Sequence, residues 1–235
     1  MKKADFMLSK QFAIIALAMG LMGIAAKLTT ISTYDGYLFA EFPELILKWN
    51  YLGFFTYTTN ILVDFWLILT ALSIFAGRGG LTRFLTGASL QGFLTVMIFT
   101  VGAIYCCFML WFDRPFSWGL WWGNVVNIWH HVVMPSFMVF LFFRPAGRTR
   151  LGGKDLALWT IYPLAYLFFT LARGGVVNWY PYPFFDQTWE TFADLGIVPW
   201  LGVTIASVFV AVFIISTSMV AIKIHNKIIR KSAVA

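Results

Sequence analysis

The sequence predicts an all-α polytopic membrane protein, a single domain over residues 1–235 with six transmembrane helices. Of the 235 residues, 60% are hydrophobic and only 11% are charged, and the mean hydropathy is +0.78. Ordinary soluble domains carry about 25% charged residues. Six apolar runs approach the length of about 20 residues that a helix needs to cross the hydrocarbon core. Basic residues gather in alternate connections between these runs, which is typical of polytopic membrane proteins.

The predicted spans lie close together, with only two longer connections. In chain order they cover Phe12–Thr30, Tyr51–Ala76, Gly87–Phe112, Gly123–Phe143, Leu156–Ala172 and Val198–Ile222. No short basic segment followed by a small-residue cleavage site stands apart from the first run, so we expect a retained helix rather than a signal peptide. Pro135 and Pro163 are expected to interrupt spans four and five, and no inverted repeat of the kind found in many transporters is visible.

Lysine and arginine set the expected orientation, because cytoplasmic loops of membrane proteins are enriched in these residues. Thirteen of the 17 fall on one side, in the N-terminal segment, connections two and four, and the C-terminal tail. The other side has four, namely Lys27, Lys48, Arg114 and Arg173. Both termini are therefore predicted to be cytoplasmic, and the expected location is a bacterial inner membrane.

The same distribution argues against several other classes of protein. The net charge of +7 resides in short segments between apolar runs, so no nucleic-acid partner is expected. Cys106 and Cys107 are adjacent within an apolar run, which favours neither an internal disulfide nor a metal site. No metal or cofactor is predicted, and the oligomeric state is unknown.

Both long connections, Ile31–Asn50 and Gly174–Ile197, are predicted to be external, and both are rich in aromatic residues and proline. We expect them to fold against the membrane surface. Five tryptophans fit an aromatic belt at the headgroup level, where amphipathic rings are favoured; they are Trp118, Trp121, Trp122, Trp179 and Trp189.

Polar residues form a stripe along the second span, in "FFTYTTNILVDFW". Thr56, Asn60 and Asp64 recur every four residues, so they share one helix face and are expected to point into the bundle. The helix rise of 1.5 Å per residue puts Thr56 about 9 Å and Asp64 about 20 Å below Asn50. Thr59 flanks the stripe.

The fourth span contains adjacent histidines, in "NVVNIWHHVVMPS". The same helix rise puts His131 about 12 Å below Gly123. Asn127 lies one turn before His131, and His130 directly precedes His131. Thr56 and the histidines are therefore predicted to lie at similar depth, on helices that can be neighbours.

This combination permits nucleophilic chemistry, because a threonine hydroxyl becomes a nucleophile when histidine removes its proton. Asn60 or Asn127 would orient the imidazole or donate to a developing oxyanion. Structural roles are the alternative, since threonine and histidine also bond within and between membrane helices. Asp64 has no cation assigned to it within the spans and is either a polar clasp or a proton-handling group.

Three motifs resemble a known family. "FFTYTTNILV" is similar to the aromatic–Phe–Thr–x–x–Ser/Thr–Asn–hydrophobic signature of the androgen-induced membrane hydrolases and their bacterial relatives. Phe54 stands at the first position of this signature, where Tyr is commoner. "HVVMP" resembles the His and Pro of the bacterial members. "YPLAYLFFTLARG" followed by "YPYPFFD" resembles their fifth span and the loop after it. The resemblance covers about half of the chain.

The resemblance implies a threonine hydrolase of esters between fatty acids and hydroxy fatty acids, acting on a membrane lipid without a cofactor. It puts the family nucleophile on Thr56 and the histidine on His131; members with five residues from His to Pro would select His130. Arg173, in "LARGG", would hold a substrate carboxylate, or it is an interfacial arginine. The "YPYPFF" loop would lie over the site as a lid, or it is an interfacial loop, where proline and aromatic residues need no such role.

Two other function classes remain open from the sequence. One is a non-catalytic lipid-binding or transport protein that uses the same polar pocket. The other is a proton-coupled carrier built around Asp64 and the histidines, although the short chain and the missing repeat argue against it.

Overall fold

The fold is described from a computed structural model, which describes residues 6–33, 50–111, 121–144, 149–188 and 194–234. These residues form helices and no strands. The long elements are α1 (Lys10–Thr33), α3 (Phe55–Phe75), α5 (Ala88–Trp111), α8 (Gly153–Val177) and α10 (Pro199–Val234). Shorter ones are η1 (Phe6–Leu8), α4 (Gly79–Leu85), α6 (Trp121–Ile128), the π turn η3 (Trp129–Val133), α7 (Met134–Phe142) and η4 (Pro183–Phe185).

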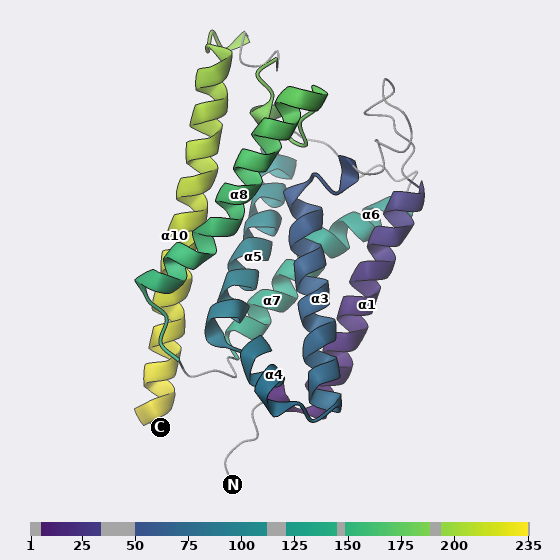
Figure 1. Cartoon of the computed structure of the whole chain (residues 1–235), viewed down its shortest axis with the longest axis vertical. Coiled ribbons are helices and arrows are strands. Elements are labelled where there is room, and N and C mark those ends of the chain that lie inside the picture. Colours follow the sequence, from purple (N-terminus) through teal and green to yellow (C-terminus); the bar gives the residue numbers. More distant parts are fainter. Residues whose placement is uncertain (1–5, 34–49, 112–120, 145–148, 189–193, 235) are drawn as a thin grey trace.

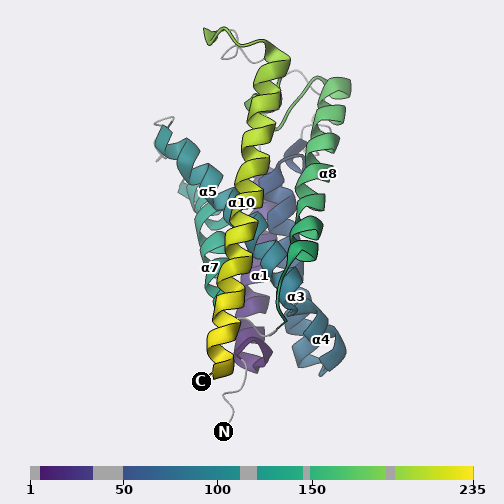
Figure 2. The same cartoon turned by 90° about the vertical axis from the view of Figure 1, so that its left-hand side faces the viewer.

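Six helices are long and apolar enough to cross a membrane, which confirms the predicted fold class at this level. The candidate spans are Lys10–Thr29, Phe55–Phe75, Ala88–Cys107, Val125–Phe142, Gly153–Val177 and Pro199–Arg230. They run roughly along the long axis of the molecule (Figures 1 and 2). We call the end where α1 begins and α10 ends the terminal end, and the opposite end, with residues 50–54 and 178–188, the loop end (Figure 1).

The helices form a central bundle with two peripheral members. α3 packs against α1 and α5, and α5 also packs against α7. α10 packs against α5 and α8. The two peripheral helices, α8 and α10, flank the bundle on one side (Figure 1). Only 11% of the apolar span of α8 and of α10 is buried, against 50% of the span of α3. The polar stripe on α3 therefore lies in the middle of the bundle.

The spans differ from prediction in three details. A short helix, α4, forms in the second connection, for which no helix was predicted. The fourth span is divided into α6, the π turn and α7, with Pro135 in the first turn of α7. The predicted interruption at Pro163 is wrong, because α8 continues through it from Gly153 to Val177; membrane helices tolerate proline when neighbours satisfy the freed backbone.

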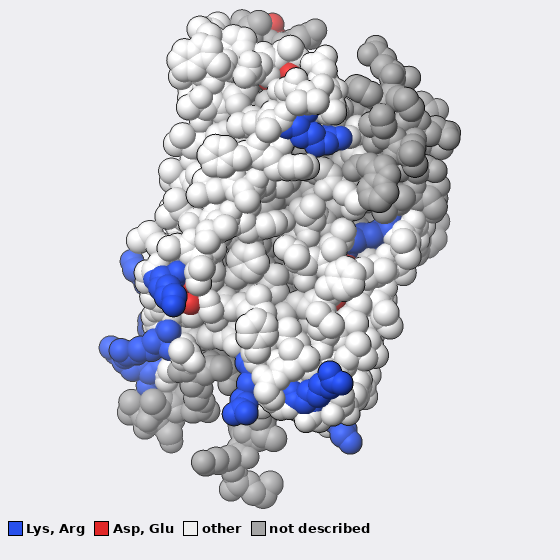
Figure 3. All heavy atoms as spheres, viewed as in Figure 1, with Lys and Arg blue, Asp and Glu red and all other residues white. Residues whose placement is uncertain are grey.

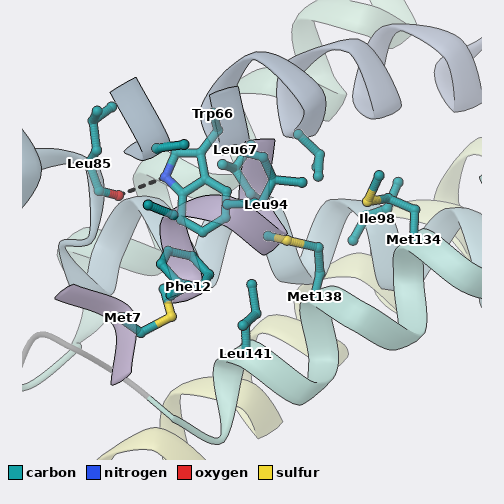
Figure 4. Packing of buried hydrophobic residues seen from close by; sticks show 14 of the residues in the cluster. Met7, Phe12, Trp66, Leu67, Leu85, Leu94, Ile98, Met134, Met138 and Leu141 are labelled. Atoms are coloured by element: carbon teal, nitrogen blue, oxygen red, sulfur yellow. Dashed lines mark hydrogen bonds between the residues drawn. The ribbon is translucent and has the colours of Figure 1, made fainter. Parts of the chain in front are cut away.

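The largest apolar cluster lies between the helices of the bundle (Figure 4). Side chains from six elements meet there, including Phe12, Leu67, Ile98 and Met138, all with an exposed fraction of 0%. The Trp66 indole N–H donates to the Leu85 carbonyl oxygen at 2.7 Å, which ties α4 to α3. Because the indole N–H has a partner, the burial of this large ring leaves that donor satisfied.

Glycines let the helices of the bundle approach closely. A Cβ at Gly20 on α1 would lie 2.8 Å from the Asp64 backbone oxygen on α3. A Cβ at Gly92 on α5 would lie 2.6 Å from the Trp159 ring, which anchors α8 on the bundle. Small residues at such crossings are typical of membrane helix interfaces, where close van der Waals packing drives association.

Basic side chains gather at the terminal end, as the sequence predicts for one side of the membrane (Figure 3). The described basic residues there come from the start of α1, the α3–α4 connection, α4, the segments just after α7 and just before α8, the start of α8 and the end of α10. They are Lys10, Arg78, Arg83, Arg144, Arg150, Lys154, Lys223, Lys227 and Arg230. Arg173 lies toward the other end, at the end of α8.

Most of the predicted aromatic belt lies outside the described residues or side chains, namely Trp118, Trp121, Trp122 and Trp189. Lys48 and Arg114 also lie outside the described residues. The exception, Trp179, has an exposed fraction of 6%. Its ring packs edge-on against Phe54 at 5.7 Å. Trp179 is therefore part of the packed loop end and does not face outward as the belt requires.

Candidate active site

The two histidines lie in the π turn between α6 and α7. Pro135, just after this turn, leaves one backbone carbonyl of the turn without its helical donor. The Met134 N–H bonds to the Trp129 carbonyl five residues earlier. In the same register the next donor would be the N–H of residue 135, directed at the His130 carbonyl. Proline has no N–H, so the His130 carbonyl needs a partner from elsewhere. Single π turns in helices are frequent at functional sites.

Asn60 on α3 supplies that partner. Its side-chain nitrogen donates to the Thr56 carbonyl oxygen at 2.9 Å and to the His130 carbonyl oxygen at 3.3 Å. The Tyr57 ring also packs edge-on against the His130 ring, with centroids 5.4 Å apart. Spans two and four are thus in direct contact, and one amide links the backbones of Thr56 and His130.

The histidines face different neighbours. His130 is completely buried, and neither of its ring nitrogens has a hydrogen-bond partner among the described residues. His131 points to α5, where its ring stacks on Tyr105 at 4.0 Å. The His131 Nδ1–H donates to the Asn127 carbonyl oxygen at 2.9 Å. His130, and not His131, is therefore the histidine whose ring packs against α3.

Asn127 supports this second arrangement and not the first. Its side-chain nitrogen donates to the Tyr105 hydroxyl at 2.7 Å, so the amide holds the ring that stacks on His131. On α5, a Cβ at Gly102 would lie 2.8 Å from the His131 carbonyl oxygen. A residue without a side chain there lets the π turn approach α5 closely.

Thr56 lies in the first turn of α3, at the loop end. Its exposed fraction is 9%. Its N–H donates to the Tyr182 hydroxyl oxygen at 3.4 Å, and its Oγ1 lies 3.5 Å from the same oxygen. Within the described residues no hydrogen bond joins the Thr56 hydroxyl to an imidazole. Burial raises the pKa of Tyr182, which favours the neutral phenol.

The loop after α8 places Tyr182 over α3. Asn178 ends α8 with φ of 50°, a left-handed conformation that asparagine tolerates better than most residues. The Tyr180 ring packs where a side chain at Gly174 would lie, so the loop folds back along the helix. The Tyr182 ring then stacks on Phe184 at 5.2 Å and meets Phe54 edge-on at 5.6 Å.

Thr59 belongs to another side of α3. It is fully buried, and its Oγ1 lies 3.1 Å from the Tyr162 hydroxyl of α8. The same hydroxyl donates to Thr58 Oγ1 at 2.9 Å, and the Tyr166 hydroxyl donates to the Gly53 carbonyl oxygen at 2.8 Å. Two tyrosines of α8 thus hold the start of α3, so Thr59 supports the position of Thr56.

Asp64 lies two turns below Thr56 and is paired with a cation, contrary to the expectation that no cation accompanies it. Lys27 Nζ lies 2.5 Å from Asp64 Oδ2, and both side chains are buried. Lys27 was counted among the external basic residues, but it lies inside the bundle on α1. Gly23, one turn earlier on α1, leaves the space that the Asp64 carboxylate occupies.

Arg173 lies at the loop end beside the loop that carries Tyr182. Its guanidinium donates to Asn50 Oδ1 and lies 5.1 Å from the centre of the Trp179 ring. Arginine has five N–H donors, and this contact uses one nitrogen. The stripe residues Thr56, Asn60 and Asp64 are buried as predicted, and Arg173 lies at the end of the bundle where Thr56 is found.

Tyr182, Tyr162, Tyr105 and Lys27 are the site residues that the sequence reasoning did not assign. Tyr182 was present only as part of the "YPYPFF" segment, whose predicted position over the site agrees with its contact to Thr56. Lys27 carried a signal, because it is a charged residue within an apolar run. A tyrosine hydroxyl in a membrane helix gives no comparable signal.

Comparisons with known proteins leave the resemblance untested. No family model, curated protein or solved structure matches the chain. Among the described residues, no group of three or more His, Cys, Asp or Glu side chains is arranged to hold a metal ion.

Proposed function

We propose that this protein is an intramembrane threonine hydrolase of lipid esters, related to the androgen-induced membrane hydrolases, with Thr56 as nucleophile and His130 as base. Its expected substrates are fatty acid esters of hydroxy fatty acids or similar lipids. The proposal includes a bacterial inner-membrane location with both termini cytoplasmic. His131, the histidine that the closer motif match selects, is the alternative base.

The observation that carries the proposal is the Asn60 amide, which contacts the backbone carbonyls of Thr56 and His130 together. The Thr56 hydroxyl and the His130 imidazole, whose nitrogens have no partner among the described residues, therefore lie on neighbouring helix backbones in the bundle interior. Catalytic hydrogen bonds are often long before substrate binds and tighten in the complex. The Thr56 hydroxyl can therefore contact Tyr182 before substrate binds and form its hydrogen bond with His130 in the complex.

The reaction needs two proton transfers at each stage. Thr56 Oγ1 attacks the ester carbonyl carbon while His130 takes the hydroxyl proton, and the tetrahedral intermediate collapses as His130 returns that proton to the leaving alkoxide. An acyl ester on Thr56 and a free hydroxy acid result. Water then attacks the acyl carbon and gives a proton to His130. Collapse releases the fatty acid, and the proton returns to Thr56.

A fluorophosphonate probe tests the nucleophile directly. Purified wild-type protein is expected to be labelled, and Thr56→Ala should abolish the labelling because the attacking oxygen is removed. Intact mass and peptide mapping give the labelled residue. Thr70→Ala is the control, since Thr70 is also a buried threonine of α3 but lies almost four turns below Thr56. Equal labelling of Thr56→Ala and wild type would overturn the proposal.

The same assay assigns the base. We expect His130→Ala to lose about 10²-fold or more in labelling rate, the scale of general base catalysis. His131→Ala, which removes the ring stacked on Tyr105, should lose less. The reverse order would transfer the role to His131.

A non-catalytic lipid-binding or transport protein is the rival, and one observation favours it: the Thr56 hydroxyl contacts Tyr182 and not an imidazole. This rival predicts lipid binding without turnover, and binding that survives Thr56→Ala. Mass spectrometry of lipids that copurify with wild-type protein separates the two cases. A hydrolase should carry a fatty ester or its acid products, and the ester should accumulate in Thr56→Ala.

A further inference from the structure

Acyl transfer through Thr56 requires a donor for the oxyanion of the tetrahedral intermediate, and the two asparagines predicted for this task are engaged elsewhere. Asn60 has two side-chain N–H groups, and its nitrogen already serves the Thr56 and His130 carbonyls. The Asn127 amide donates to Tyr105, on the side of the π turn that faces α5. Neither amide is available at the Thr56 hydroxyl without breaking these contacts.

We propose that Tyr182 is a catalytic residue of this reaction, whose phenol donates a hydrogen bond to the oxyanion formed at Thr56. This inference rests on the proposed function. The Tyr182 oxygen lies 3.5 Å from Thr56 Oγ1, so a carbonyl carbon attached to Oγ1 would hold its oxygen within reach of the phenol. Tyrosine hydroxyls serve as oxyanion donors in other enzymes.

The hydrogen bonding of Tyr182 suits it to donate. Its oxygen accepts the Thr56 N–H, one of the first N–H groups of α3, which lack acceptors within the helix. A phenol that accepts one hydrogen bond is polarised toward donating its own proton. Because burial raises the pKa of Tyr182, the proton stays on the oxygen at neutral pH.

The surroundings of Tyr182 hold it in place before substrate arrives. Its ring stacks on Phe184 and packs edge-on against Phe54 and Phe185, with centroids between 5.2 and 6.0 Å apart. Phe54 is the residue before α3, two positions from Thr56. The phenol is thus packed in an aromatic cluster that includes Phe54, two positions before the nucleophile, and a preorganised donor needs little rearrangement during the reaction.

Tyr182→Phe tests the donor while keeping the ring that packs in this cluster. Hydrolysis of a fluorogenic long-chain ester is measured in detergent for wild type, Tyr182→Phe and Tyr180→Phe, with thermal unfolding as the check on folding. We expect kcat to fall about 10²–10³-fold in Tyr182→Phe, with KM within twofold of wild type. Tyr180, in the same loop, packs on Gly174, so Tyr180→Phe should keep the wild-type kcat.

A kcat within twofold of wild type, or a change in KM alone, would overturn the role of Tyr182 while leaving Thr56 labelling intact. Failure of the proposed function looks different, because wild type itself would then show neither labelling at Thr56 nor turnover.

Fluorinated tyrosines at position 182 keep the test decisive if Tyr182→Phe is unstable. Their phenols differ in acidity and hence in donor strength, whereas their shapes are nearly the same. A donor role predicts a kcat that changes steadily along the series at constant thermal stability. A kcat that is constant across folded members of the series would overturn it.

Discussion

At the scale of single residues, the Lys27–Asp64 pair shows how a buried charge is tolerated inside an apolar bundle. An ionised side chain away from water is costly unless it is paired. Asp64 Oδ2 has Lys27 Nζ at 2.5 Å, and Lys27 Nζ also donates to the Gly23 carbonyl oxygen at 3.2 Å. The pair ties α1 to α3 directly below the candidate site.

Removing one member of this pair should be far worse than removing both. We expect Lys27→Met to destabilise the protein by about 3–5 kcal/mol, because Asp64 is left without its cation. The double variant Lys27→Met with Asp64→Leu should regain most of the loss. Thermal unfolding in detergent, followed by circular dichroism, measures both. A double variant no more stable than Lys27→Met would contradict this account.

Arg173 permits a test of substrate chemistry at the same scale. A guanidinium at the loop end that holds a free carboxylate should affect only substrates that have one. We expect Arg173→Gln to raise KM about tenfold or more for an ester with a free acid group, an effect of at least about 1.4 kcal/mol. KM for the methyl ester of that substrate should stay within twofold. Equal effects on both substrates would exclude this anchoring role.

At the scale of the elements, the position of α3 depends on close approach to α1. At Gly20 a Cβ would meet the Asp64 backbone oxygen at 2.8 Å and Ile68 Cγ1 at 2.7 Å. A backbone oxygen cannot rotate away, so the two helices would have to separate. That separation would also strain the contact between Lys27 and Asp64.

We therefore expect Gly20→Ala to destabilise the protein by about 1–3 kcal/mol, the usual range for overpacking a tight interior. Gly175→Ala on α8 is the matched control, because nothing lies within 4 Å of its added Cβ. The comparison uses thermal midpoints in one detergent. A Gly20→Ala midpoint equal to or above that of Gly175→Ala would show that the crossing is looser than described.

The π turn is the element that the sequence predicted least well. The segment "HHVVMP" contains two histidines and a proline, but helical spacing alone does not choose between His130 and His131. The π register and the missing N–H of Pro135 together free the His130 carbonyl for Asn60. The extra residue in one turn rotates the side chains around the helix axis. Ideal helix spacing therefore predicts the depth of a histidine better than the direction in which its ring points.

At the scale of the whole molecule, charge separates the two ends. Described lysines and arginines gather at the terminal end (Figure 3), whereas the candidate site lies toward the loop end. With the positive end in the cytoplasm, Thr56 would be reached from the external half of the bilayer.

Reporter fusions test this orientation. We expect a C-terminal green fluorescent protein to fluoresce and a C-terminal alkaline phosphatase to be inactive, because phosphatase requires export to fold. A phosphatase fused after Thr188, in the predicted external loop, should be active and is the positive control. An active phosphatase at the C-terminus would invert the orientation.

The sequence by itself determined the six spans and the buried stripe of Thr56, Asn60 and Asp64. Both follow from local quantities, namely the length and hydropathy of each run and the periodicity of one helix. Only the tertiary structure decided that His130 faces α3, that Lys27 pairs with Asp64 and that Tyr182 covers Thr56. These contacts join residues far apart in the chain, and they depend on the rotation of each helix about its axis and on the path of a loop. Hydropathy carries no information about either.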